Sequence, residues 1–243
     1  MNNYEKLEGM VAATFTPLDE NGDVNLSVID KYADWIASTP IKGVFVCGTT
    51  GEFSSLTIDE RKLILEKWLV SARKRFKVIA HVGSNCQRSA MELARHAAQV
   101  GADAIASIAP SFFKPGTVDE LVDFFAPICH SAAGLPFYYY NMPSITGVNL
   151  PVDKFLVEGK KKIPNLVGTK FTHNNLMEMG VCIELEQHRF EVLHGYDEIL
   201  ISGLAMGAVA GVGSTYNYIP NVYQAIFDSM KMNDLETARH NQD

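Results

Sequence analysis

Eight short apolar runs, separated by stretches with helical periodicity, constrain the fold of this chain more than any other feature. Most of the runs are apolar throughout and do not alternate, which is typical of strands buried on both faces of a parallel sheet. The 243 residues, 47% of them hydrophobic, suffice for one large domain with a buried core. The runs are Met10–Phe15, Gly43–Cys47, Val78–Val82, Ala104–Ala109, Pro136–Asn141, Leu166–Phe171, Phe190–Leu193 and Ala208–Val212.

Helix signals lie between these runs. Thr57 and Glu60 have the spacing of a capping box, in which each side chain bonds the backbone amide of the other residue. Apolar residues then recur at helical spacing, and Gly101 is placed to end the next helix. The apolar face predicted for the first of these helices consists of Leu63, Leu65, Trp68 and Leu69.

Strands and helices that alternate eight times predict an α/β protein with a (β/α)8 TIM barrel, an architecture that needs roughly 250 residues. A doubly wound open sheet is the alternative, because local periodicity does not show whether a parallel sheet closes on itself. We expect residues 1–243 to form a single domain.

Composition argues against several functional classes. The formal net charge of −7 gives the chain no electrostatic reason to bind nucleic acid or an anionic membrane. No apolar run approaches the roughly 20 residues that cross a bilayer. The four cysteines are scattered, without a C-x-x-C pair or zinc-site spacing, so we expect reduced thiols, a cytoplasmic location and no metal site.

Polar residues at four strand ends are candidates for chemistry, because active sites of parallel barrels gather at the carboxyl ends of the strands. The second run ends in Gly48-Thr49-Thr50-Gly51-Glu52, where two hydroxyls and successive amides form a compact turn suited to a carboxylate. A tight strand-to-helix turn with a hydroxyl N-cap explains the same residues equally simply.

The fifth run ends in three tyrosines followed by Asn141-Met142-Pro143. Alternation places Tyr138 and Tyr140 on one side of the strand and Tyr139 on the other. A tyrosine hydroxyl near a barrel mouth can relay a proton. Three tyrosines can also be ordinary strand-forming aromatics with a polar tip.

Lys170 stands within the apolar sixth run. A lysine rarely occupies such a position unless its ammonium has a task or reaches water. In a dry barrel mouth a neutral amine is favoured, and it can attack a ketone or aldehyde to form an imine that draws electrons from a neighbouring C–C bond. The alternative is a surface lysine whose amine extends into solvent.

The seventh and eighth runs lead into Gly195-Tyr196-Asp197-Glu198 and Gly213-Ser214-Thr215-Tyr216-Asn217. Paired acids beside a hydroxyl-rich turn can bind sugar hydroxyls. They can also be first-turn acids that interact favourably with a helix dipole.

In this order and on these strands, the motifs resemble the N-acetylneuraminate lyase and dihydrodipicolinate synthase family, and in particular its animal lyase branch. The likeness runs from about Leu7 to the end of the chain, with five motifs that agree in order and spacing. The segments most similar to the animal branch are Gly9–Thr14, Ile108–Pro115, Leu135–Tyr140 and Val212–Tyr218.

The resemblance implies a role for each candidate residue. Lys170 would form a Schiff base with the carbonyl of a pyruvate unit, and Tyr140 would shuttle a proton at the substrate oxygen. Thr49 and Thr50 would hold the pyruvate carboxylate. The positions implied to line the sugar end of the pocket are Thr172, Gly195, Asp197, Glu198, Gly213 and Ser214.

The implied activity is that of a class I aldolase, an oxo-acid lyase that cleaves the sialic acid N-acetylneuraminate reversibly to N-acetylmannosamine and pyruvate. The iminium serves as electron sink, so no cofactor is expected. The expected partners are these small molecules and copies of the chain itself, because family members commonly form homotetramers. The alternatives are a pyruvate aldolase of the same family with another 2-keto-3-deoxy sugar acid as substrate, and a non-catalytic form that only binds ligand or partners.

Three departures from the family pattern stand out. Ile145 occupies a position where dihydrodipicolinate synthases carry an arginine for an acidic second substrate. Phe113 lacks the hydroxyl of a tyrosine that bacterial relatives contribute across a subunit contact. Family members continue for several helices after the barrel, whereas 233–243 resembles only the start of that C-terminal helical extension, which we expect to be truncated here.

Overall fold

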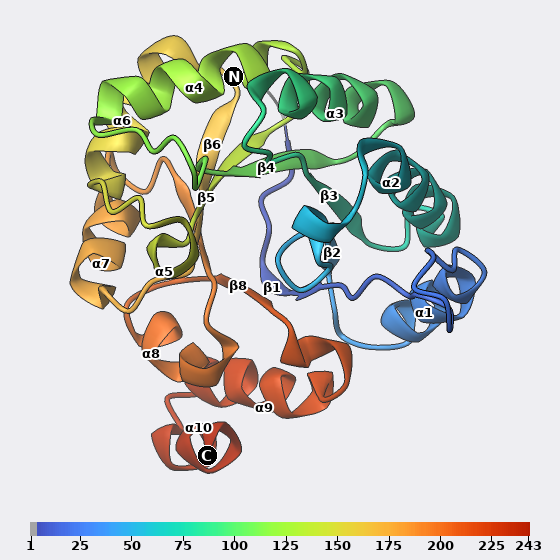
Figure 1. Ribbon diagram of the computed structural model, residues 1–243. Coiled ribbons are helices and arrows are strands. Elements are labelled where there is room, and N and C mark those ends of the chain that lie inside the picture. Colours follow the sequence, from blue (N-terminus) through green and yellow to red (C-terminus); the bar gives the residue numbers. More distant parts are fainter. Residues whose placement is uncertain (1–3) are drawn as a thin grey trace.

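Eight parallel strands close into a barrel in this computed structural model, which describes residues 4–243 (Figure 1). Residues 1–3 of the predicted domain lie outside the described part. Each strand pairs with the next one along the chain, and β1 pairs in parallel with β8 to close the sheet. The strands are β1 (Gly9–Ala13), β2 (Gly43–Val46), β3 (Lys77–His81), β4 (Ala104–Ile108), β5 (Phe137–Asn141), β6 (Leu166–Phe171), β7 (Glu191–His194) and β8 (Ala210–Gly213).

Helices surround the strands, as the ring of coiled ribbons in Figure 1 shows. Across residues 4–243, no helix has both the length and the apolar character that a bilayer span requires. The helices are α1 (Val28–Ala37), α2 (Ile58–Ala72), α3 (Gln87–Val100), α4 (Val118–His130), α5 (Pro143–Thr146), α6 (Val152–Lys162), α7 (Leu176–Glu184), α8 (Leu200–Ala205), α9 (Pro220–Lys231) and α10 (Leu235–Gln242). Three 3-10 segments follow strand ends: η1 (Phe53–Ser55), η2 (Asp197–Ile199) and η3 (Thr215–Asn217).

The closed strand order confirms the predicted (β/α)8 barrel. It rules out the doubly wound open sheet, in which the first and last strands of the order would not pair with each other. All eight predicted runs form strands, with bounds within two residues of those expected. Because every strand runs in the same direction, their carboxyl ends meet at one mouth of the barrel.

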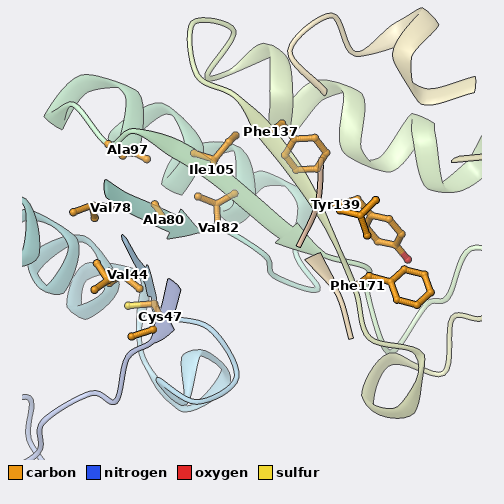
Figure 2. Close-up of a cluster of buried hydrophobic side chains, with 14 of the residues drawn as sticks. Val44, Cys47, Val78, Ala80, Val82, Ala97, Ile105, Phe137, Tyr139 and Phe171 are labelled. Atoms are coloured by element: carbon orange, nitrogen blue, oxygen red, sulfur yellow. The ribbon is translucent and has the colours of Figure 1, made fainter. Parts of the chain in front are cut away.

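Alternation along the strands sorts the apolar side chains into two layers. Tyr139 points outward and packs against Phe125 and Phe155, with ring centroids 5.5 and 4.6 Å away. Tyr138 and Tyr140 belong to the inner layer, so the predicted division of the three tyrosines is confirmed. Figure 2 shows part of the outer layer, including Val44, Val78, Phe137 and Tyr139.

Helix α2 confirms one prediction and corrects another. Thr57 and Glu60 form the full capping box, each side chain bonding the backbone amide of the other residue. The sequence places Leu63 on the buried face, but Leu63 is 50% exposed, whereas Arg61 and Ile64 are buried. The helix can bury Arg61 because its guanidinium donates to two main-chain carbonyls at the end of β3.

The segment predicted to begin a C-terminal extension, 233–243, contains α10. Asp234 caps this helix, accepting a hydrogen bond from the Thr237 amide at 3.1 Å. The Gln242 side chain accepts from a main-chain amide of α8 at 2.9 Å and donates to the Asp197 carbonyl at 3.1 Å. These bonds fix α10 to the segment that follows β7 at the barrel mouth.

Candidate active site

Lys170 lies on β6 inside the carboxyl mouth of the barrel and is only 4% exposed. The strand register places it beside Tyr140 of β5 and Leu193 of β7, both members of the inner layer. A lysine with its amine in bulk water is therefore the wrong interpretation. The strand also needs Gly168 two residues earlier, because a Cβ there would lie 1.9 Å from a main-chain carbonyl oxygen of β7.

Two aromatic faces surround the Lys170 amine. Nζ lies 4.0 Å from the ring centroid of Tyr140 and 4.5 Å from that of Phe45. The two rings meet edge to face, with centroids 5.6 Å apart. Because an aromatic face attracts a cation, the same surroundings suit both an ammonium and an iminium formed from this nitrogen.

Tyr140 and Thr49 meet across the barrel mouth. The Tyr140 hydroxyl lies 3.1 Å from Thr49 Oγ1, and either oxygen can be the donor. The same hydroxyl lies 3.1 Å from Met142 Sδ, a weak acceptor. Two residues predicted from separate motifs, 91 positions apart in the chain, are therefore in direct contact beside the amine.

The turn after β2 has a tightly constrained backbone. Cys47 and Glu52 adopt left-handed φ angles of 54° and 55° at its two ends. Gly48 has no room for a side chain, because a Cβ would lie 2.7 Å from the Phe45 ring. Thr16 anchors the far side by donating to the Gly51 carbonyl at 2.7 Å.

The amides of this turn are available to a ligand. Within residues 4–243, neither the Thr49 nor the Thr50 amide donates to a main-chain carbonyl. Both side chains are partly exposed at the mouth. Unbonded amides on a fixed turn can hold a small anion, which is compatible with the predicted carboxylate site.

The hydroxyl at the end of β6, that of Thr172, makes no hydrogen bond among the described residues. Thr172 is buried, and the oxygen concerned is its Oγ1. Gly195, at the end of β7, lies against it, since a Cβ on Gly195 would come within 1.9 Å of that oxygen. Glycine is therefore the residue that leaves the Thr172 hydroxyl in place.

The paired acids after β7 differ in their surroundings. Asp197 is buried, and its Oδ2 accepts from the Thr215 amide at 2.7 Å and from the Thr215 hydroxyl. A Cβ on Gly213 would lie 2.6 Å from the Asp197 carboxyl carbon. Glu198 is exposed, and Ser214 is partly exposed. Partial desolvation, with a smaller contribution from the Asp197 charge, raises the pKa of the Glu198 carboxyl.

Asp197 thus joins the segments that follow β7 and β8, whereas Glu198 and Ser214 remain accessible. The two sequence interpretations, sugar binding and helix-end stabilisation, do not apply equally to the two acids. Asp197 begins a 3-10 segment and accepts bonds from the neighbouring turn, which is a structural role. Glu198 is the acid with access to a ligand.

Two aromatic residues of the candidate site were missed by sequence reasoning. Phe45 carries no signal, because a phenylalanine is ordinary in a buried strand. His81, at the end of β3, is buried, with its ring centroid 5.8 Å from that of Tyr140. A histidine within an otherwise apolar run was the available signal.

The opposite end of the barrel holds a hollow of about 1070 Å³, lined in part by Lys42, Lys77 and Asp103. None of the predicted catalytic residues lines it, so we assign the site from its chemistry and not from cavity size. Across residues 4–243, no group of three His, Cys, Asp or Glu side chains is placed to hold a metal ion.

The two positions that depart from the family pattern both lie on the surface. Ile145 of α5 is 59% exposed and places no cation there. Phe113 is 87% exposed, and its ring contacts that of Phe112 with centroids 5.0 Å apart.

Comparison with known proteins agrees with the geometry of the candidate site. A model of the Dihydrodipicolinate synthetase family matches residues 6–243. The N-acetylneuraminate lyase of Mus musculus is 43% identical over 237 residues, which cover 96% of this chain and 74% of the mouse protein. The Gallus gallus N-acetylneuraminate lyase is 44% identical, with 98% of this chain and 79% of the chicken protein covered.

Among solved structures, the N-acetylneuraminate lyase (sialic acid aldolase) of Aliivibrio salmonicida superposes with a TM-score of 0.96 at 38% sequence identity. The superposition covers 98% of this chain and 79% of the Aliivibrio chain.

Proposed function

Because the chain belongs to the Dihydrodipicolinate synthetase family, we propose that it is a class I aldolase that cleaves N-acetylneuraminate reversibly to N-acetylmannosamine and pyruvate. The observation that carries the proposal is the buried amine of Lys170 between two aromatic faces, next to the hydrogen-bonded pair of Tyr140 and Thr49. A nucleophilic nitrogen, a hydroxyl that can move a proton and an anion-binding turn are the three groups that this reaction needs.

Imine formation is the first step. The Lys170 amine attacks the keto carbon of the open-chain sugar acid, and the resulting carbinolamine loses water to give an iminium. The free amides of Thr49 and Thr50 hold the substrate carboxylate and thereby orient the keto carbon toward Nζ. The faces of Phe45 and Tyr140 lie close to the new cation.

Carbon–carbon cleavage follows. The C4 hydroxyl gives its proton to the Tyr140 oxygen while Tyr140 passes its own proton to the substrate carboxylate, and the electrons of the C3–C4 bond move into the iminium to form an enamine. N-acetylmannosamine leaves with the new aldehyde. The enamine is then protonated at C3, and hydrolysis of the imine releases pyruvate and regenerates the free amine.

The sugar end of the substrate lies toward the ends of β6, β7 and β8. There we propose that the hydroxyls of Thr172 and Ser214 and the carboxyl of Glu198 bind the sugar hydroxyls. Gly195 leaves room for the Thr172 hydroxyl and Gly213 for the Asp197 carboxyl, and Asp197 keeps the neighbouring turns in register through Thr215.

Reductive trapping tests the proposal. Pyruvate with borohydride should add one irreversible adduct to the protein and none to Lys170→Ala. Release of N-acetylmannosamine from sialic acid, measured against other 2-keto-3-deoxy acids, then identifies the substrate. A folded protein that forms no adduct would be a ligand-binding form, and a faster reaction with another sugar acid would make it a different aldolase of the family.

We also expect a cytoplasmic homotetramer. The exposed pair of Phe112 and Phe113 supports self-association, because exposed aromatic pairs are common at protein interfaces. Light scattering on the purified protein should give the mass of four chains, and a monomer mass would contradict this part of the proposal.

A further inference from the structure

We propose that His81 is a positioning residue that holds the anion-binding turn and the Tyr140 ring in place for capture of the substrate carboxylate. The inference rests on the proposed function, since it assigns a task within that site. His81 touches neither the amine of Lys170 nor the free hydroxyls of the mouth. It acts through the main chain of the turn and through the aromatic rings that border it.

The hydrogen bond from His81 reaches the point at which the turn begins. Nδ1 lies 2.8 Å from the carbonyl oxygen of Cys47. Cys47 is the residue directly before Gly48, and it has a left-handed φ of 54°, which an L-residue with a side chain rarely adopts. A bond to this carbonyl fixes the direction in which the next peptide groups, including the Thr49 amide, leave the strand.

The His81 ring makes this bond as a neutral donor, because its charged form is disfavoured. Burial, and then the positive charge of Arg61, hold the pKa of His81 well below its usual value. The carbonyl of Cys47 can only accept, so the proton of the neutral imidazole is on Nδ1. Nε2 is left without a partner among the described residues and faces Gly83, where a Cβ would lie 2.6 Å from it.

The same ring packs against the aromatic residues of the site. Its centroid lies 5.8 Å from that of Tyr140 at an interplanar angle of 85°, and 5.8 Å from that of Phe45. These are the two rings whose faces lie over the Lys170 amine. Phe53, just after the turn, closes the other side with its centroid 4.5 Å away.

Arg61 of α2 supports His81 from outside the barrel. Its guanidinium donates to the carbonyl of His81 at 2.7 Å and to that of Gly83 at 2.9 Å, which fixes the end of β3. It also lies 5.4 Å from the ring centroid of Phe53. Arg61 therefore fixes the main chain of His81, and the side chain of His81 in turn fixes the anion-binding turn.

Two probe molecules distinguish a loss of this positioning role from a general loss of structure. Pyruvate carries the carboxylate that the turn would bind, whereas hydroxyacetone is a ketone of similar size without it. Borohydride trapping at a series of probe concentrations gives the half-saturating concentration for each. The ratio of the two values reports the contribution of the turn, independently of the amine itself.

The variants are His81→Phe, His81→Gln and His81→Asn. Phe keeps the ring without the donor, Gln places its amide near the position of Nε2, and Asn places its amide near that of Nδ1. We expect Phe and Gln to raise the half-saturating pyruvate concentration about tenfold, the equivalent of one lost hydrogen bond, while hydroxyacetone changes less than about twofold. Asn should restore pyruvate capture to within about threefold of the original.

His194→Asn is the matched control, because His194 is a buried histidine at the end of β7 that packs against α8 and makes no contact with the turn. It should leave the ratio unchanged. An unchanged ratio in both His81→Phe and His81→Gln would overturn the inference, as would an equal loss for both probes in all three His81 variants. If the original protein is not trapped by pyruvate at all, the proposed function fails first; if it is trapped and only the ratios disagree, the role of His81 fails alone.

Discussion

Two tyrosines of β5, separated by one residue, lie at opposite ends of the barrel interior and have contrasting surroundings. Tyr138, toward the amino end, donates to Glu191 Oε2 at 3.1 Å. The Leu7 amide donates to the same oxygen at 2.9 Å, which attaches the segment before β1 to this end of the barrel. Within residues 4–243, the hydroxyl of Tyr140, at the carboxyl mouth, bonds only to the side chains of Thr49 and Met142.

The two ends differ in whether their polar groups are hydrogen-bonded within the protein. At the amino end, burial and then the charge of Glu191 raise the pKa of Tyr138, so its hydroxyl keeps its proton and acts as a fixed donor. At the mouth, the Thr172 hydroxyl has no hydrogen-bond partner among the described residues, and the Thr49 and Thr50 amides donate to no main-chain carbonyl there. Under the proposed function, one strand therefore serves structure at one end and chemistry at the other.

Among the variants that test this contrast, Lys170→Ala should have the largest effect. Without the amine no imine forms, so we expect the rate of sialic acid cleavage to fall at least about 10⁴-fold. Circular dichroism and the melting temperature should show a folded barrel, because the change removes a polar group from an apolar interior. Appreciable cleavage by the folded variant would remove Lys170 from the mechanism.

Tyr140→Phe tests whether the Tyr140 hydroxyl moves the proton at the mouth. The ring remains over the amine, so pyruvate should still be trapped, but the proton acceptor for the C4 hydroxyl is lost. We expect kcat for cleavage to fall about 10²- to 10³-fold, the usual contribution of a general acid–base group. Steady-state kinetics and trapping on the same preparation measure both effects, and an unaffected kcat would show that another group moves the proton.

Tyr138→Phe is the matched change at the amino end. It removes a donor from the buried Glu191 carboxylate, which should lower the free energy of unfolding by about 2–3 kcal/mol. Urea denaturation measures this loss. The kcat of the folded protein should stay within about twofold of the original, and a fall comparable to that of Tyr140→Phe would break the division between the two ends.

Acid should destabilise the protein through the mouth, where His81 is buried without charge. Its pKa in the folded state lies well below the value of about 6.5 expected when unfolded, so the unfolded chain binds more protons as the pH falls. The stabilising contribution is therefore complete above about pH 6.5 and is lost progressively as the pH falls below it. Urea midpoints between pH 7.5 and 5 should fall less steeply in His81→Phe, and parallel curves would contradict a neutral buried histidine.

The fold could be predicted from the sequence because eight apolar runs with intervening helical spacing have few parallel arrangements. Closure of the sheet could not, since the pairing of β1 with β8 joins residues about 200 positions apart and leaves no local pattern. Leu65 and Trp68 of α2 are buried as predicted, whereas Leu63 was misplaced for a related reason. Arg61 is buried by main-chain carbonyls of another element, and such acceptors have no signature in the sequence.

The site was predictable where a residue conflicts with its local surroundings. Lys170 is a charge in an apolar strand, and that conflict was informative without any structure. Tyr138 and Tyr140 share a face, so alternation alone did not separate the structural tyrosine from the one at the mouth. Phe45 and His81 act through contacts between neighbouring strands, which only the closed barrel brings together.

The proposed mechanism requires that a keto acid become attached to Lys170. The protein should be incubated with pyruvate, reduced with borohydride, digested and mapped by peptide mass spectrometry. We predict a single reduced adduct on the peptide that contains Lys170, at a stoichiometry approaching one per chain and absent when pyruvate is omitted. A Lys170 peptide that stays unmodified, or adducts spread equally over exposed lysines such as Lys161, would contradict the account.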